Sequence, residues 1–173
     1  SVPPSWVYTR FLKALYRHVD LIDRMFDELV EGLRGSLPEF GRILSMDSKA
    51  VDSHARGSRR DKGRKEGDGR REGDADYGVK TYHGKREDGT VWEKVKSWFG
   101  FKIHLLIDAS YELPVGYEVT KASVSDIKAG KDLLAQVSDR HPELLRGAQE
   151  CLADGAYDDT GLITELWDEH GIK

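Results

Sequence analysis

The sequence predicts an α/β protein in which helices flank a mixed β-sheet. Residues 5–35 and 125–139 place apolar side chains at helical spacing, and residues 98–108 alternate with the two-residue period of a strand. Two short apolar segments flank these elements: 43–47 precedes the strand at 98–108, and 150–154 follows the helix at 125–139. Strands and helices in this order, beside an antiparallel hairpin, form a mixed sheet covered by helices.

An N-terminal helical segment occupies residues 1–40. Its apolar positions recur at helical spacing: Phe11, Leu12, Leu15, Tyr16, Ile22, Met25, Phe26, Leu29, Val30 and Leu33. We expect a bend near His18, with Asp20 capping a second helix. Gly35 ends the pattern, and residues 41–173 form the second unit.

The second unit begins with a short strand over residues 43–47, in which Ile43, Ser45 and Asp47 share one face. The strongest strand signal follows at 98–108. Its two faces carry different side chains: Phe99, Phe101, Ile103, Leu105 and Ile107 on one, and Lys102, His104 and Asp108 on the other.

A turn at 109–110 joins this strand to a hairpin partner within residues 111–120, where Pro114 marks an edge or a bulge. Ser125 then caps a helix that runs to about Asp139. The inward positions of that helix are Leu133, Leu134 and Val137.

The next strand covers residues 150–154, and a final helix covers 159–170. We expect the final helix to turn four side chains inward: Leu162, Ile163, Leu166 and Trp167.

Between the first two strands lies a basic insertion, residues 55–96, with abundant Gly, Arg, Lys and Asp and almost no aliphatic side chains. From Arg56 to Arg71 eight Arg/Lys face three acids, a local balance of +5. This asymmetry predicts a polyanionic partner; the alternative is a solvated loop with no partner. Alternation at Val79 and Thr81 indicates a minor strand in the distal half.

Composition excludes several classes of protein. The net charge of −4 argues against a uniformly basic nucleic-acid coat. The single cysteine, Cys151, excludes an intramolecular disulfide and a cysteine-based zinc site, and its apolar strand predicts a small buried side chain. No apolar run approaches membrane-spanning length, and the first residues lack a signal-peptide pattern.

Two aspartates stand at the C-terminal ends of predicted short strands and are candidate metal ligands. If the strands at 43–47 and 150–154 are adjacent and parallel, Asp47 and Asp154 lie at one rim of the sheet. Two carboxylates held close together repel, and a divalent cation such as Mg²⁺ or Mn²⁺ relieves the repulsion. The alternative is that each aspartate only starts a turn or caps a helix.

Six short motifs in order resemble the catalytic domain of bacterial insertion-sequence DDE transposases of the IS4-like group, from about Pro38 to Lys173. The motifs are Met46-Asp47-Ser48-Lys49, Asp76-Tyr77-Gly78, Trp98-Phe99-Gly100-Phe101-Lys102-Ile103-His104, Glu112-Leu113-Pro114, Val119-Thr120-Lys121-Ala122-Ser123 and Ala153-Asp154-Gly155-Ala156-Tyr157-Asp158. The resemblance implies an RNase H-like fold, two Mg²⁺ ions (or Mn²⁺), and DNA strand cleavage followed by strand transfer.

The resemblance places Asp47 at the family's first acidic ligand and Asp154 at the second. The third acid, usually a glutamate on a later helix, has no counterpart: Glu165 and Glu169 come too early in the chain. We therefore expect the C-terminal part of the fold to be missing and this fragment alone to be inactive. A small nuclease that uses Glu165 or Glu169 is a separate hypothesis, and it requires that acid to reach the rim.

The expected partner is double-stranded DNA, from element ends and target, in the bacterial cytoplasm at the nucleoid. Candidate phosphate contacts are Arg56, Arg59, Arg60, Arg64, Lys65 and Lys102. Whether copies of the chain assemble into an oligomer is left open. The alternative function is a catalytically inactive DNA-binding or assembly remnant of a transposase.

Overall fold

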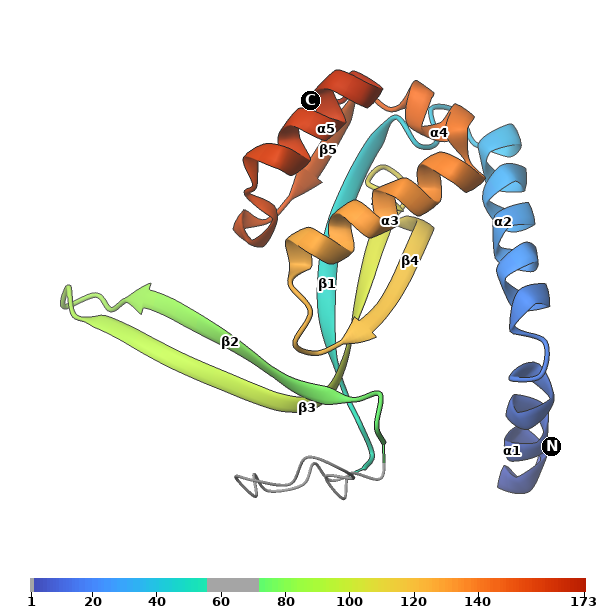
Figure 1. The fold of residues 1–173 in the computed structure, drawn as a ribbon, viewed down its shortest axis with the longest axis horizontal. Coiled ribbons are helices and arrows are strands. Elements are labelled where there is room, and N and C mark those ends of the chain that lie inside the picture. The colour runs from blue at the N-terminus through green and yellow to red at the C-terminus, as the bar shows by residue number, and fades with distance from the viewer. Residues whose placement is uncertain (1, 56–71) are drawn as a thin grey trace.

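The computed structural model describes residues 2–55 and 72–173 and has a mixed α/β architecture, as predicted (Figure 1). Its elements are α1 (Ser5–Leu15), α2 (Val19–Ser36), β1 (Ile43–Asp52), β2 (Asp76–Lys85), β3 (Val91–Asp108), β4 (Leu113–Lys121), α3 (Asp126–Arg140), α4 (Pro142–Gly147), β5 (Glu150–Ala153), the 3₁₀ turn η1 (Gly155–Tyr157) and α5 (Thr160–His170). No helix in these ranges is long and apolar enough to span a bilayer.

The core of the sheet has the strand order β4-β3-β1-β5. Strand β3 pairs antiparallel with β1 and with β4, and β1 pairs parallel with β5. Pro114 coincides with a register shift opposite Ile107, which confirms the predicted bulge. On the far edge of β5, the Lys173 amide donates to the Gln149 carbonyl (3.0 Å), and the Cys151 amide donates to the Lys173 carbonyl (2.8 Å).

The basic insertion contains more strand than the sequence predicted. Residues 76–85 and 91–100 form a two-stranded ribbon that projects from the body (Figure 1). Its turn is closed by Asp88, whose Oδ1 accepts from the Thr90 amide (2.9 Å), and by Gly89 at φ 85°. Asp88-Gly89 is a hairpin-turn dipeptide, and it is the local signal from which the missed first half of β3 could have been predicted.

Helix α3 covers the sheet face that carries Met46 and Leu106, both buried. Ser125 caps it as predicted, accepting from the Lys128 amide (3.3 Å), and the three predicted inward residues are buried. A Cβ at Gly130 would meet the Met46 sulfur at 2.9 Å, so the helix lies very close to β1. This close packing fixes the start of α3 beside the rim at the end of β5.

The more polar face of β3 is the more deeply buried one. His104 and Asp108 are fully buried, whereas the alternating aromatic and aliphatic face is only half-buried. Asp108 is satisfied by backbone donors: its Oδ2 accepts from Gly41 (2.7 Å) and its Oδ1 from Ser110 (3.0 Å) and Tyr111 (2.7 Å). It therefore holds the hairpin turn together.

The two N-terminal helices are confirmed, although His18 rather than Asp20 occupies the N-cap of α2. Helix α2 contributes Val30 to the core. It is anchored by His141, whose Nδ1 lies 2.9 Å from Glu31 Oε1 and whose Nε2 lies 3.2 Å from Asp27 Oδ1. The hydrogen bond to His141 is the main cause that lowers the pKa of Glu31.

Helix α5 buries less of its surface than predicted. Leu162 is buried and Leu166 packs against the core, but Ile163 and Trp167 are each 55% exposed. The prediction that these two side chains point into the core is therefore wrong. The side of α5 that packs against the core is narrower than the apolar stripe in the sequence.

Cys151 is partly buried, and burial raises the pKa of its thiol to about 11. Against an ordinary value of 9.0, this leaves roughly 100-fold less thiolate at about pH 8. We expect Ellman's reagent to label the native protein correspondingly slowly and the urea-unfolded protein at the rate of a free thiol. Equal rates in the two states would contradict the buried position.

Candidate functional site

The parallel pairing of β1 with β5 places the two candidate aspartates at equivalent positions. The last register pair is Met46↔Ala153, so Asp47 and Asp154 are the next residue along each chain. Asp154 directly follows β5, but Asp47 lies inside β1, which continues to Asp52 in its pairing with β3 and does not end at Asp47 as predicted. Both side chains are exposed. The predicted adjacency of the two strands is confirmed, and with it the position of both residues at one rim.

Each aspartate uses one oxygen locally and keeps the other available. Asp47 Oδ1 accepts from the Ser48 amide (2.7 Å), and Asp154 Oδ1 accepts from the Ala156 amide (2.9 Å), which caps η1. Neither Oδ2 has a hydrogen bond with the described residues. A capping role and a ligand role are therefore compatible at this rim.

The pKa of Tyr157 reflects its burial and the acidic side chains at the rim. Its side chain is buried, and its hydroxyl makes no hydrogen bond of regular geometry with the described residues. Burial raises the pKa of Tyr157; the Ser48 hydroxyl opposes the increase, and the carboxylates of Asp126, Asp47 and Asp154 add to it. Three acidic side chains therefore lie within electrostatic range of one phenol.

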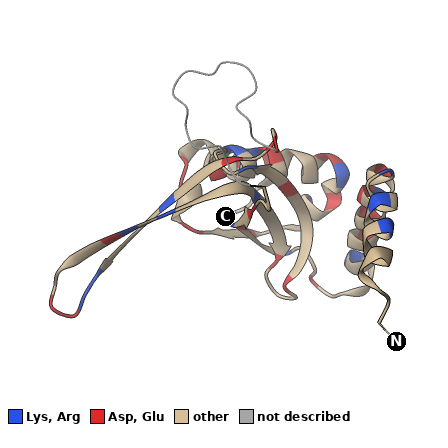
Figure 2. Ribbon diagram, turned by 90° about the horizontal axis from the view of Figure 1, so that it is seen from below, with Lys and Arg blue, Asp and Glu red and all other residues tan. Residues whose placement is uncertain are grey.

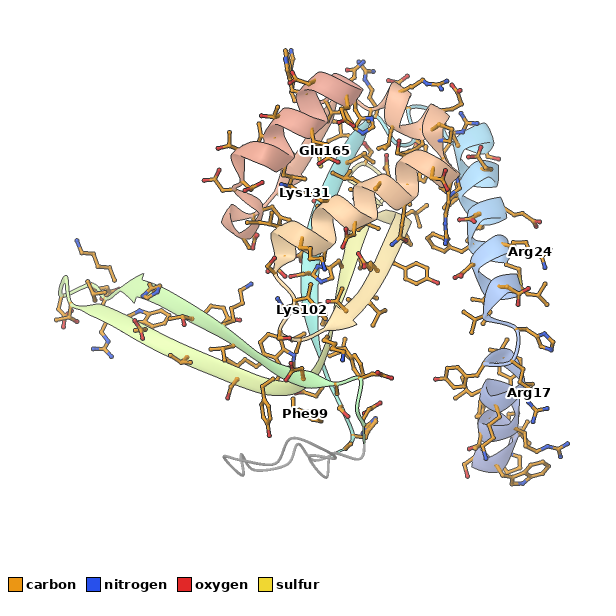
Figure 3. The ribbon with its side chains drawn as sticks, viewed as in Figure 1. Arg17, Arg24, Phe99, Lys102, Lys131 and Glu165 are labelled. Atoms are coloured by element: carbon orange, nitrogen blue, oxygen red, sulfur yellow. The ribbon has the colours of Figure 1, made fainter. Side chains whose placement is uncertain are left out.

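Asp126 is the residue at this rim that the sequence reasoning missed. It is the first residue of α3, and its Oδ1 accepts from Lys102 Nζ at 2.9 Å. Lys102 also donates to the Val124 carbonyl (2.8 Å), and its side chain is only 14% exposed (Figure 3). The Ser-Asp pair at a helix start was visible in the sequence, but the loop that brings it to Lys102 was not.

Beneath Asp126 lies His104, which is fully buried. The Thr120 hydroxyl lies 3.0 Å from His104 Nε2 and donates to the Lys121 carbonyl, so Nε2 carries the proton. Nδ1 has no hydrogen bond and lies 3.9 Å from Asp126 Oδ1. Burial lowers the pKa of His104; Asp126 opposes this shift and Lys102 adds to it.

A buried neutral histidine makes stability depend on pH. The folded-state pKa of His104 is below its ordinary 6.5, so the unfolded chain binds the proton more readily. The contribution to stability is present above about pH 6.5 and is lost as the pH falls. We expect urea unfolding to show a smaller loss of stability between about pH 7.5 and 5.5 in His104→Gln than in wild type. His83→Gln, on the exposed ribbon, is the control and should keep the wild-type slope.

The other predicted site residues fall in two groups. Arg56, Arg59, Arg60, Arg64 and Lys65 lie outside the described residues. Glu165 lies on α5 (Figure 3), and within residues 2–55 and 72–173 no three His, Cys, Asp or Glu side chains are arranged to hold a metal ion. In this arrangement neither Glu165 nor Glu169 joins the two aspartates as a third ligand.

The donor set at the rim fits a hard divalent cation. Mg²⁺ and Mn²⁺ take oxygen ligands, and Mg²⁺ is commonly held by one or two carboxylates while it keeps several waters. The free oxygens of Asp47 and Asp154 are such ligands, and both are open to solvent. Lys102 is already paired, so its charge does not compete for them.

Comparison with known proteins gives one match. The family model described as the transposase DDE domain matches residues 38–173. Domains of this family generally use divalent metal ions, and they act on DNA. No curated protein matches the chain. No solved structure matches it. With the family model covering β1 through α5 and both rim aspartates, the chain belongs to the transposase DDE domain family.

Proposed function

We propose that this chain provides the metal-binding rim for DNA strand cleavage and strand transfer in a bacterial IS4-like insertion element. The observation that carries the proposal is the register of β1 with β5, which sets Asp47 and Asp154 at equivalent positions just beyond the last paired residues of the two parallel strands. The strand order β4-β3-β1-β5, with α3 crossing one face, supports an RNase H-like fold for the domain.

The chain's own residues would contribute binding and positioning. Asp47 and Asp154 would hold the cation, with Asp47 fixed by its place in β1 and its bond from the Ser48 amide, and Asp154 fixed by capping η1. A bound Mg²⁺ or Mn²⁺ supplies activation of the attacking oxygen and neutralises charge at phosphorus. Tyr157 packs behind the rim and keeps a neutral hydroxyl there, since burial raises its pKa.

A catalytically inactive DNA-binding or assembly remnant is the second candidate. One observation favours it: Asp126 at the rim is already paired with Lys102, and no three acids of the described residues form a group suited to a metal ion. A complete set of protein ligands around the metal ion would need a residue from outside the described residues. The two candidates differ in whether metal-dependent cleavage accompanies DNA binding.

The test is nicking of a supercoiled plasmid in Mg²⁺ or Mn²⁺ by the intact transposase that contains these 173 residues, because the fragment alone is expected to be inactive. We expect nicks that disappear with EDTA and in Asp47→Asn, which keeps the acceptor for the Ser48 amide. Asp139→Asn, an exposed acid on α3, is the matched control and should nick as wild type does. DNA binding without any nicking would favour the remnant.

A further inference from the structure

A groove of about 500 Å³ separates the β2–β3 ribbon from the body of the protein. Ser48 and Ala50 of β1 line it on the body side, and residues 79–82 of β2 line it on the ribbon side. Asp126, at the start of α3, closes one part of it. In Figure 1 the ribbon leaves the body below this end of α3.

The groove begins at the metal-binding rim. Ser48 directly follows Asp47, and Ala156 lies two residues after Asp154; both line the groove. A chain lying in the groove would therefore reach the two aspartates without crossing another element. This continuity connects the groove with the reaction proposed for the rim.

The lining is strongly basic. Four lysines line the groove against one acid, Asp126. Lys102 and Asp126 neutralise each other at 2.9 Å. The other three, Lys49, Lys80 and Lys96, make no ion pair with the described residues. Figure 2 shows lysine and arginine positions along the ribbon itself.

Two of these lysines oppose each other directly. Lys80 and Lys96 are register partners on β2 and β3, so they share one face of the ribbon. Like charges directly opposite in an antiparallel pair are destabilising. An anion between the two ammonium groups would turn this repulsion into two attractions, which is the arrangement expected of an anion site.

The ribbon also offers an aromatic surface on a fixed base. Tyr82 lines the groove, with Lys80 Nζ 5.8 Å from its ring centroid. Trp98 fixes the ribbon where it leaves the body: its Nε1 donates to the Phe101 carbonyl (3.1 Å), and a Cβ at Gly78 would meet its ring at 2.4 Å. Lysines beside an exposed aromatic ring suit a sugar–phosphate chain better than an isolated anion.

We propose that this groove binds the phosphodiester backbone of one DNA strand adjoining the rim, with Lys49, Lys80 and Lys96 contacting phosphates. The inference rests on the proposed function, because it takes DNA as the polyanion. Contacts of this kind give salt-sensitive affinity that does not depend on base sequence.

The test measures binding of a fluorescein-labelled DNA duplex to the 173-residue chain by anisotropy, in EDTA, over a range of NaCl concentrations. The variant is Lys49→Gln/Lys80→Gln/Lys96→Gln. We expect affinity to fall about tenfold or more at roughly 100 mM salt, and the slope of log K against log[salt] to become shallower by about 2.7, or roughly 0.9 per lost contact. The control Lys13→Gln/Arg17→Gln/Lys85→Gln removes equal charge from exposed positions outside the groove and should change affinity less than about twofold.

A second measurement separates binding from folding. Lys80→Gln/Lys96→Gln removes the opposed charges, so its melting temperature at low salt should equal or exceed that of wild type while DNA affinity falls. A lower melting temperature would mean that the lysines only support the fold, and would overturn the proposal.

Other outcomes also overturn it. Equal loss in the groove and control variants would show that only total charge matters, and competition by millimolar inorganic phosphate would indicate a site for a single anion. A wild-type chain that binds no DNA refutes the inference as well. EDTA removes metal chemistry from the binding assay, so the two proposals can fail separately. If the triple-lysine variant binds DNA more weakly as expected but no nicking is found, only the proposed cleavage is refuted. If the triple-lysine variant binds DNA as tightly as wild type and nicking is found, only the proposed DNA-binding groove is refuted.

Discussion

Replacing Gly100 by alanine is expected to unfold the domain or to cost more than about 3 kcal/mol of stability. At this residue β3 passes from the projecting ribbon into the central sheet, so Gly100 pairs with Asp52 of β1 on one side and with Asp76 of β2 on the other. A Cβ here would meet the Val51 carbonyl oxygen at 2.1 Å and the Ser53 nitrogen at 2.6 Å. Both are backbone atoms of the neighbouring chain, so no side chain can rotate away.

The measurement is a thermal melt followed by circular dichroism. For a chain of this size about 3 kcal/mol corresponds to a fall of roughly 6–12 °C in melting temperature. Gly32→Ala is the matched control, because it lies inside α2 with no atom within 4 Å of the added Cβ. It should gain up to about 1 kcal/mol from helix propensity. A Gly100→Ala protein with the melting temperature of wild type would show that β1 and β3 are not in close contact at this point.

Local signals in the sequence predicted the longer helices, but the short helix α4 was not predicted. Helix α3 has its cap at Ser125 and its three inward side chains at helical spacing, all within fifteen or so residues, and the structure agrees on each. Periodicity was less informative for α5. It predicted a wide apolar stripe, but which part of that stripe is covered depends on α3 and the rest of the core, and Trp167 stays exposed.

Long-range pairing explains most of what was missed in the sheet. The ribbon half of β3 carries polar or charged side chains on both faces, so it lacks the alternation that burial of one face produces. Alternation within residues 98–108 was recognised, but alternation does not say which face α3 covers. The structure buries the face of His104 and Asp108, where Thr120 partners His104 Nε2 and the turn backbone partners Asp108, while His104 Nδ1 is left without a hydrogen bond.

The candidate site divides in the same way. Asp47 and Asp154 could be paired from the sequence because adjacent parallel strands set equivalent positions side by side, although the sequence did not show that β1 continues past Asp47 to Asp52. Asp126 and Lys102 are 24 positions apart, and their contact depends on the path of the loop between β4 and α3. No pattern in the residues specifies that path, so the neutralised lysine could not be distinguished from a free one.

Replacing either rim aspartate by asparagine is expected to remove at least about 90% of the Mn²⁺ affinity, measured by electron paramagnetic resonance titration. If one cation is held by both carboxylates, either single variant removes half of the negative charge that the protein supplies to it. The effects of residues that act as a unit are not additive. Asp47→Asn/Asp154→Asn should therefore bind only slightly more weakly than either single variant, whereas two independent sites would give the product of the two single effects. Asp139→Asn is again the control and should titrate like wild type.

The fold should withstand these changes, and this separates a metal site from a purely structural one. Asparagine keeps a side-chain oxygen for the Ser48 amide at position 47 and for the Ala156 amide at position 154. Removing one of two neighbouring negative charges also relieves their repulsion and reduces the charge near the buried Tyr157 hydroxyl. We therefore expect the metal-free variants to melt at or slightly above the wild-type temperature. Added Mn²⁺ should then raise the melting temperature of wild type alone, since only a protein that binds the ion in its folded state is stabilised by it. Equal stabilisation of wild type and both variants would mean that the ion binds elsewhere and that the two aspartates serve only as caps.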